Sequence, residues 1–389
     1  MDRRTFLARG LALGCSAAAS PFLTPMVFAQ APWEGRLVVI VLRGAMDGLD
    51  AVQPIGDPAF RGLRPLLAAP EGVLPLDGFW GLHPALAPLL PLWQAGEFGA
   101  VHAVSTPYRD RRSHFDGQDI LEAGTPGLTG EARRDGWLNR LLAAVPGITA
   151  ETAYAIGREE MLILSGRAPI TRWTPEARLH LSPQARQLIE VVQLDDPLFR
   201  NALLQALDIV DGIEQDGMAG GSTGGAGHIR LASFAASRLR AETRIASFSL
   251  SGWDTHGRQA NAMPQALARL SDSILALRDG LGPVWRQTAV LCLTEFGRTA
   301  RENGSGGTDH GTGGAMLYAG GALRGGQVAG DWPGLGEGAL YVDRDLLPTR
   351  DLRAHAAWVM RGLFGLSRDV LEGAVFPGLD IGPDNRLVL

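Results

Sequence analysis

Acidic and histidine side chains in this sequence gather in short clusters that follow apolar runs. Carboxylates and imidazoles are common protein ligands of divalent metal ions, and ligands placed at strand ends can converge at one edge of a sheet. The pattern therefore predicts a metal site built from several strand ends. The candidate ligands are Asp47, Asp254, His256, Glu295, Asp309 and His310.

Several of these residues also have a purely structural interpretation. Asp254 and His256 are two positions apart after an apolar run, so both can point to the same side. Taken singly, Asp254 could form an Asx-turn and His256 a buried hydrogen bond, and Asp47 could accept backbone N–H groups in a turn. A buried Glu295 needs a cationic partner, and a salt bridge to Arg298 is the structural alternative.

A second kind of chemistry is indicated by the stretch Arg112-Ser113-His114. A serine at the start of a helix is well placed for nucleophilic attack, because the helix N-terminus stabilises negative charge. We therefore predict Ser113, His114 and Arg112 as catalytic residues. The neighbouring Arg109 and Arg111 could hold an anionic group of a substrate. Ser113 also fits a capping box, so it could simply cap the helix.

Strand-like apolar runs alternate with helical periodicity along the chain, which is typical of a parallel sheet with crossover helices. We predict an α/β fold with a mostly parallel central sheet sandwiched by helices, and the candidate ligands at its carboxyl edge. The strongest helical pattern runs from Met263 to Leu277, with Gly280 as its C-terminal cap, and a last helix is expected after Thr349 as N-cap. The predicted strands are 37–42, 98–104, 245–250, 288–294 and 315–319.

The middle of the chain lacks these motifs, and we predict a cap or insertion over the sheet edge at about 149–230. A short strand is expected at 160–164 and a helix from Ser182. Residues 217–227 are rich in Gly, Ser and Thr and indicate a flexible loop, since no Gly-Lys-Ser/Thr follows to make a phosphate-binding loop. The whole domain would cover residues 30–389.

The N-terminal residues form a targeting signal rather than part of the fold. Arg3-Arg4-Thr5-Phe6-Leu7 is a twin-arginine pattern, and a short, weakly apolar stretch follows it. We predict cleavage after Ala29, which makes 1–29 a signal peptide; an uncleaved anchor and a lipoprotein at Cys15 are the alternatives. The sequence thus predicts a periplasmic or secreted protein with the twin-arginine translocase as a partner.

Composition excludes several other classes of protein. The formal net charge is -5 and no strongly basic face is present, which argues against a nucleic-acid partner. No second stretch approaches the apolar length of a membrane span, so we expect no transmembrane span in the mature chain. With Cys15 removed, Cys292 is the only cysteine and no internal disulfide can form.

With these residues in place, the chain resembles the alkaline-phosphatase and sulfatase-like superfamily. It is more closely similar to a twin-arginine-exported branch catalogued as a domain of unknown function, and the resemblance covers nearly the whole mature chain. The motifs that carry it are, in order, Leu-Arg-Gly-Ala-Met-Asp47-Gly-Leu, Arg112-Ser113-His114-Phe-Asp, Asp135-Gly-Trp-Leu-Asn-Arg140, Gly-Trp-Asp254-Thr-His256-Gly, Thr-Glu295-Phe-Gly-Arg298-Thr and Thr-Asp309-His310-Gly-Thr.

The resemblance implies an alkaline-phosphatase-like fold with two metal ions. One ion would be held by Asp47 and Glu295 together with Ser113, and the other by Asp254, His256 and His310. The divalent metal is expected to be zinc, with manganese, magnesium or calcium as alternatives. The implied activity is hydrolysis of phosphate or related esters, with a small anionic ester as substrate.

Differences from the superfamily pattern support a second hypothesis. Asp254 and His256 are separated by one residue where the phosphatases commonly have three, and Glu295-Phe296 stands where many members have Asp-His. Ser113 does not begin the Cys/Ser-x-Pro-x-Arg stretch of the sulfatases, which argues against sulfatase activity by that route. The alternative is a non-catalytic exported protein that retains the fold and has a metal-binding or assembly role.

Overall fold

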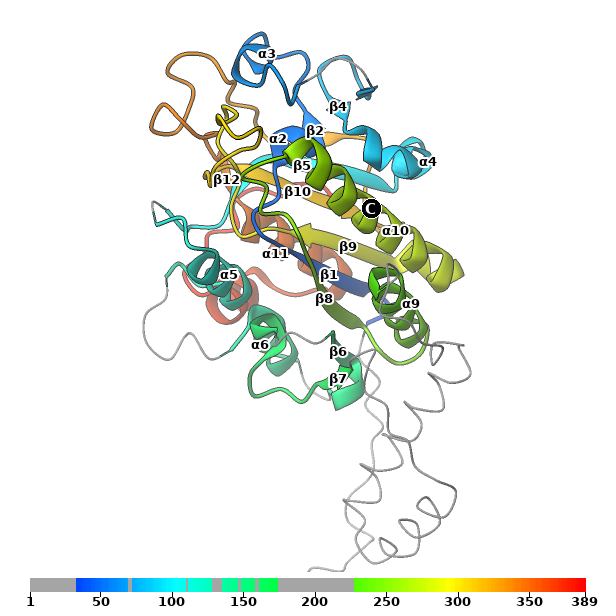
Figure 1. The fold of residues 1–389 in the computed structure, drawn as a ribbon. Coiled ribbons are helices and arrows are strands. Elements are labelled where there is room, and N and C mark those ends of the chain that lie inside the picture. Colours follow the sequence, from blue (N-terminus) through cyan, green and yellow to red (C-terminus); the bar gives the residue numbers. More distant parts are fainter. Residues whose placement is uncertain are drawn as a thin grey trace, which may run out of the picture.

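A central β-sheet with helices on both faces organises the molecule (Figure 1). The computed structural model describes residues 33–68, 72–109, 111–127, 135–145, 148–157, 161–173 and 227–389. In this part of the chain the sheet has the order β11-β5-β10-β9-β1-β8-β6-β7, with β12 paired to β5. Its strands are β1 (Arg36–Arg43), β5 (Phe98–Ser105), β6 (Ala153–Ile156), β7 (Thr171–Trp173), β8 (Ile245–Ser251), β9 (Thr288–Leu293), β10 (Gly314–Ala319), β11 (Val328–Ala329) and β12 (Arg350–Asp351).

The middle of this sheet is parallel. Strand β1 lies between β8 and β9 and runs parallel to both, with Arg43 opposite Ser251 and Val41 opposite Leu293. Because parallel strands end at the same edge of a sheet, the segments that follow these three strands emerge side by side. Strand β10 is antiparallel to β5 and β9, whereas the other described pairs of this sheet are parallel. The predicted α/β class with a mostly parallel sheet is confirmed.

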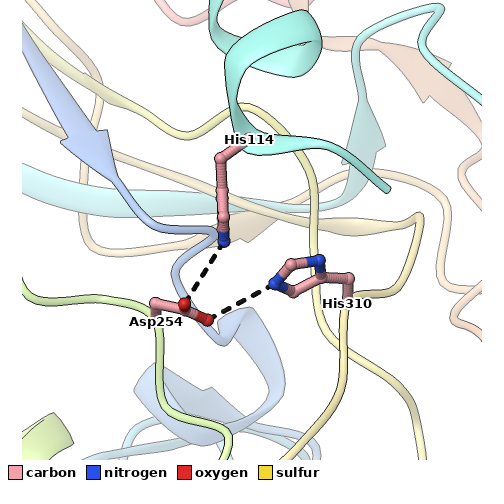
Figure 2. Close-up of side chains that lie close together, drawn as sticks. All are labelled: His114, Asp254 and His310. Atoms are coloured by element: carbon pink, nitrogen blue, oxygen red, sulfur yellow. Dashed lines mark hydrogen bonds and ion pairs between the residues drawn. The ribbon is translucent and has the colours of Figure 1, made fainter. Parts of the chain in front are cut away.

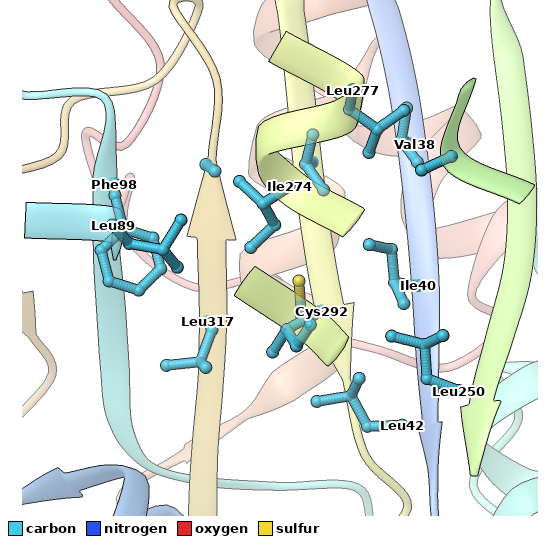
Figure 3. Packing of buried hydrophobic residues seen from close by; sticks show 14 of the residues in the cluster. Val38, Ile40, Leu42, Leu89, Phe98, Leu250, Ile274, Leu277, Cys292 and Leu317 are labelled. Atoms are coloured by element: carbon cyan, nitrogen blue, oxygen red, sulfur yellow. The ribbon is translucent and has the colours of Figure 1, made fainter. Parts of the chain in front are cut away.

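Helices cover both faces of the sheet and divide the core into two layers. Val38, Ile40 and Leu42 of β1 pack with α9 and α10, and Figure 3 shows Ile274 and Leu277 of α10 over this face. The alternate residues of β1 pack with α6 and α11 on the opposite face. This alternation follows from the two-residue period of a strand. The helices are α2 (Gly48–Ala51), α3 (Phe60–Leu63), α4 (Leu90–Gln94), α5 (His114–Ala123), α6 (Trp137–Ala143), α9 (Gly227–Arg240), α10 (Gln259–Leu281), α11 (Leu352–Phe364) and α12 (Arg368–Val370).

Smaller elements complete the described fold. A second sheet of three short strands has the order β2-β4-β3. None of the helices in the described ranges is long and apolar enough to cross a bilayer. The remaining elements are β2 (Val52–Gln53), β3 (Leu74–Pro75), β4 (Gly81–Leu82), the 3-10 helices at Pro84–Leu89, Ala150–Thr152, Leu162–Leu164 and Gly282–Gln287, and a π-helix at Leu371–Val375.

All five predicted strands are present, whereas two predicted helix boundaries are wrong. Gly280 lies inside α10, and the helix ends at Gly282, whose φ of 56° is a conformation that glycine adopts without strain. Helix α11 is capped by Asp351, which accepts a hydrogen bond from the Arg353 backbone, and Thr349 lies outside it. An aspartate is as good an N-cap as a threonine, so the pattern alone could not separate them.

The predicted cap at 149–230 is not confirmed. Its described beginning supplies β6 and β7, which extend the central sheet beside β8. The expected strand at 160–164 is wrong for its described part, because Leu162–Leu164 forms a 3-10 helix. The helix predicted from Ser182, most of the Gly-rich loop and the signal peptide at 1–29 lie outside the described residues.

A buried histidine on β5 makes the stability of this fold depend on pH. His102 Nε2 lies 3.2 Å from the Gly48 carbonyl and 3.1 Å from the Val52 carbonyl, while Nδ1 accepts from the Ala103 backbone. Burial lowers the pKa of His102 to about 4. The unfolded chain therefore takes up this proton first, and the stabilisation present above pH 6.5 is lost as pH falls from there toward 4.

We predict that His102→Gln reduces this acid sensitivity. Between pH 7.5 and pH 5 the wild type should lose about 2 kcal/mol more of its free energy of unfolding than the variant. Urea unfolding in EDTA at both pH values measures the difference. Phe98→Leu, a buried change on the same strand without a titratable group, should lower stability equally at both. Parallel pH curves for wild type and His102→Gln would contradict the prediction.

Candidate metal centre

Three side chains from distant parts of the sequence meet at the carboxyl edge of the sheet. Figure 2 shows His114 from the start of α5, Asp254 from the loop after β8 and His310 from the loop before β10. One ligand atom from each lies within 4.8 Å of the others, so the group could hold a metal ion. The expected convergence of strand-end residues at this edge is therefore observed.

The orientation of each imidazole is fixed by its Nδ1 atom. His114 Nδ1 lies 2.8 Å from Glu295 Oε1, and His310 Nδ1 lies 2.8 Å from the Arg112 carbonyl. Since carboxylates and carbonyls only accept hydrogen bonds, both Nδ1 atoms must donate. In the neutral rings each Nε2 then carries a lone pair, which is how metal-binding histidines are usually prepared by their outer partners.

His256 extends this group on its exposed side. Its Nδ1 donates to Asp309 Oδ1 at 3.1 Å, so its Nε2 also carries the lone pair of the neutral ring. That Nε2 lies 2.9 Å from His310 Nε2 and 3.2 Å from Asp254 Oδ1. His310 Nε2 lies 3.4 Å from the same carboxylate oxygen.

The donor set fits a cation better than it fits the metal-free protein. His114 Nε2 is buried, lies 3.5 Å from Asp254 Oδ2 and makes no hydrogen bond within the described chain. Lone pairs from neutral imidazoles that face one another and a carboxylate repel unless a proton or a metal ion lies among them. A divalent ion would satisfy Asp254 and the surrounding Nε2 atoms together.

A buried arginine holds the ligand-bearing segments together. The Arg298 guanidinium donates to the carbonyls of Ala45 at 2.8 Å, Thr308 at 3.1 Å and Trp253 at 3.0 Å. It also donates to Asp254 Oδ1 at 2.6 Å. The salt bridge predicted as an alternative between Glu295 and Arg298 is therefore wrong, because Arg298 pairs with the carboxylate of the neighbouring loop.

Glu295 anchors His114 from beneath the site. Its side chain is fully buried, and Oε1 accepts from the Gly44 backbone at 2.9 Å, from His114 and from Gln118 at 3.1 Å. Gln118 in turn accepts from Arg43 at 2.8 Å. Glu295 thus acts on the candidate ligands through His114, and its predicted direct contact with a metal stays a prediction.

The Gly-rich motifs allow two loops to pack backbone against backbone. The Gly311 amide donates to the Gly297 carbonyl at 2.8 Å, and Arg298 and His310 form an antiparallel bridge. A Cβ atom on Gly297 would clash with the Gly313 carbonyl oxygen, and one on Gly311 would clash with the carbonyl carbon of Arg298. No side chain fits at either position, so glycine is required for this contact.

The surroundings set the protonation of the site. Burial alone would raise the pKa of Asp254, but the hydrogen bond and charge of Arg298 hold it below its usual range. Burial also opposes ionisation of Glu295, yet hydrogen bonds from His114 and Gln118 lower its pKa. The bond to Glu295 raises the pKa of His114, and burial lowers that of His310. Both carboxylates are therefore ionised at neutral pH.

Asp47 is placed outside this group, and its turn interpretation is confirmed. Asp47 Oδ1 accepts from the Leu49 and Asp50 backbones at 3.1 and 3.3 Å. Its Oδ2 accepts from Arg64 at 2.7 Å and from Gln259 at 2.7 Å. Both oxygens are committed to hydrogen bonds, and its role as a ligand of a second ion stays a prediction.

The predicted catalytic residues have mixed positions. Ser113 is the N-cap of α5, and its Oγ accepts from the Asp116 backbone at 3.4 Å, as the capping interpretation requires. Arg112 has a φ of 53° and offers its carbonyl to His310. His114 joins the candidate ligands, a role that the helix-start pattern did not indicate because its acidic partners are distant in sequence.

A cavity of about 250 Å³ adjoins the cluster at Asp309. Its wall includes two cationic side chains, Arg301 and Arg344, and three acidic ones, Glu302, Asp309 and Asp343. Arg344 donates to the His310 carbonyl at 3.0 Å, so the cavity and the metal cluster share a wall. The polar lining could accept a charged group of a bound molecule.

Comparison with known proteins identifies a family but no activity. A family model described as "Protein of unknown function (DUF1501)" matches residues 93–360, which is well over half of the chain. This agrees with the predicted membership of a family of unknown function. No curated protein matches the chain.

Solved structures show only loose likeness. The C-terminal periplasmic domain of EcEptC from Escherichia coli has 12% identity and a TM-score of 0.38, with 92% of this chain and 94% of that chain covered. A protein in the alkaline phosphatase superfamily from Vibrio parahaemolyticus has 13% identity and a TM-score of 0.34, with 82% and 69% covered. Lipoteichoic acid synthase LtaP from Listeria monocytogenes has 10% identity and a TM-score of 0.34, with 70% of this chain covered and only 58% of that one. At these TM-scores the likenesses do not assign a superfamily or an activity to this chain.

We predict that His114→Ala lowers zinc affinity by at least about 100-fold, because it removes a ligand rather than an outer partner. Zinc titration against a chromophoric chelator and elemental analysis after dialysis measure the effect. The control is His228→Ala, since His228 pairs with Asp272 on α10, outside the cluster. Equal zinc content in wild type and His114→Ala would remove His114 from the ligand set.

Proposed function

The chain belongs to the family described as protein of unknown function (DUF1501), and we propose that it is an exported metal-dependent hydrolase of phosphate or related esters. The observation that carries the proposal is the convergence of His114, His256 and His310 on Asp254. Three imidazoles and one carboxylate suit zinc better than magnesium or calcium, which prefer oxygen ligands. Export rests on the twin-arginine pattern at the N-terminus.

The side chains around the site have separate tasks in this proposal. A divalent ion, when bound, supplies polarisation of an ester oxygen and a lowered pKa for water. Glu295 and Asp309 keep the imidazoles oriented, so little reorganisation is needed when substrate arrives. In the adjoining cavity, Arg301 and Arg344 are the groups that meet the negative charge of the substrate, and they offset the acidic Glu302, Asp309 and Asp343 of the same wall.

Ser113 is the proposed nucleophile. It directly precedes His114, and its hydroxyl lies at the N-terminus of a ten-residue helix, where developing negative charge is stabilised. Arg112 is adjacent, and its side chain is partly exposed and 4.0 Å from Asp345. If Ser113 only caps the helix, water is the attacking group.

The alternative function is metal binding without catalysis. It is favoured by His256, because this residue would complete four protein ligands with Asp254, His114 and His310. Structural zinc sites are closed by four protein ligands, whereas catalytic sites keep an open position. The same side chains would therefore suit either a catalytic ion held by His114, His310 and Asp254 or a structural ion held by these three and His256.

We predict ester hydrolysis by zinc-loaded wild-type protein and none by the loaded His114→Ala variant. A panel of phosphomonoesters, phosphodiesters and sulfate esters tests the substrate class, with manganese loaded in parallel. Activity that survives in His114→Ala would indicate a contaminating enzyme. Stoichiometric zinc with no turnover on any ester would support the non-catalytic alternative.

The role of Ser113 can be separated from its capping contribution. We predict that Ser113→Ala abolishes turnover while costing about 1 kcal/mol of stability and a few degrees of melting temperature. Ser367→Ala is the matched control, because Ser367 caps α12 through the Val370 backbone at 3.3 Å. It should show a similar small loss of stability with full activity. An active Ser113→Ala protein would assign the attack to water.

A further inference from the structure

A buried glutamine lies between the two loops that carry most of the candidate ligands. Gln259 is the first residue of α10 and is fully buried. Its Oε1 accepts from Thr255 Oγ1 at 2.9 Å and from Thr308 Oγ1 at 2.8 Å, and the Thr308 hydroxyl also lies 3.2 Å from Asp47 Oδ2. Thr255 lies between Asp254 and His256, and Thr308 directly precedes Asp309. One amide oxygen thus receives a hydroxyl from each ligand-bearing loop.

The other end of the amide is held by two buried acids. Gln259 Nε2 donates to Asp47 Oδ2 at 2.7 Å and to Asp50 Oδ2 at 2.8 Å. Because carboxylates accept and cannot donate when ionised, the NH₂ group must face the acids and the oxygen must face the threonines. This requirement fixes the amide in one orientation and turns its oxygen toward both threonine hydroxyls.

The backbone around Gln259 brings the same two loops together. The backbone N–H of Gln259 donates to the Gly306 carbonyl at 2.9 Å, and the backbone N–H of Thr308 donates to the Thr255 carbonyl at 3.1 Å. The preceding residue, Arg258, has a φ of 52°, which is unfavourable for a residue other than glycine. The chain therefore makes a sharp, strained turn between His256 and Gln259. This turn places the Gln259 side-chain amide within hydrogen-bond distance of Thr255 and Thr308.

We infer that Gln259 is a positioning residue that holds the Asp254–His256 and Thr308–His310 loops in the spacing required for metal binding; the inference rests on the metal centre of the proposed function. Gln259 makes no hydrogen bond to the clustered side chains of His114, Asp254, His256 and His310 and acts on them through the threonines beside them. Outer partners of metal ligands typically change metal affinity by about 10- to 100-fold.

The first test compares two buried glutamines that share one partner. Gln53 also donates to Asp50, at 3.3 Å, but its amide reaches neither threonine. Zinc affinity of the full chain, measured by chelator competition, should fall about 10- to 100-fold in Gln259→Met and stay within about two-fold of wild type in Gln53→Met. Thermal unfolding of the metal-free proteins shows how much stability each change costs.

A double-mutant cycle with a milder variant gives a second test, which is needed if Gln259→Met does not fold. Thr255→Val keeps the shape of the side chain and removes its hydroxyl bond to Gln259. It should weaken zinc binding several-fold in the wild-type background and have no further effect in Gln259→Met. Thr243→Val is the matched control. Thr243 lies just before β8 begins, and its hydroxyl donates to the Glu151 carbonyl. It should leave zinc binding unchanged.

The outcomes separate this inference from the proposed function. Wild-type protein that binds no zinc or manganese overturns the metal centre and the positioning role together. Zinc binding by wild type that is unaffected in Gln259→Met and Thr255→Val overturns the positioning role alone. Equal weakening in Gln259→Met and Gln53→Met would also overturn it, because the effect would then come from Asp50. If Gln259→Met does not fold, Thr255→Val against Thr243→Val decides.

Discussion

The buried guanidinium of Arg298 is the interaction on which the rest of the site depends. From the segment after β9 it contacts the segments after β1 and β8 at once, through the Gly44, Ala45 and Trp253 carbonyls and the Asp254 carboxylate. A fully buried cation is costly unless its donors are satisfied, and five acceptors around one planar fork leave little freedom to the loops. Because the three parallel strands are in fixed register, the hydrogen bonds of Arg298 hold Asp254 in one position.

Two polar networks then support the candidate ligands from different sides. On one side, Glu122 pairs with Arg43 at 2.7 Å, and Arg43 donates a hydrogen bond to Gln118. Gln118 and His114 both donate to Glu295. On the other side, the Asp47 and Asp50 pair reaches the ligand loops through Gln259. Networks of this kind are stabilising only when every member is paired, and their pairing also restricts each side chain to one rotamer.

The sequence predicted the scaffold better than the site. Strands such as β1 and β9 are apolar runs of the right length, and the acids directly after them could be placed at one edge because parallel strands end together. What it could not give were pairings between residues far apart in sequence. Arg298 was paired in prediction with nearby Glu295, whereas the structure pairs it with Asp254. Gln259 was missed because an isolated glutamine near a helix start carries no signal until its partners are known.

Whether the proposed site is catalytic or only binds a metal ion depends on the role of His256. His114 is held by the fully buried Glu295 and His310 by the Arg112 carbonyl, whereas His256 is about half exposed and its partner Asp309 is equally so. Weakly buried hydrogen bonds contribute less to rigidity than buried ones, since water competes for the same donors. If an ion binds at this cluster, His256 would therefore be the side chain most easily displaced from it. His114, His310 and the Arg298-paired Asp254 would then hold the ion, and His256 could join or leave them without moving the sheet beneath the site.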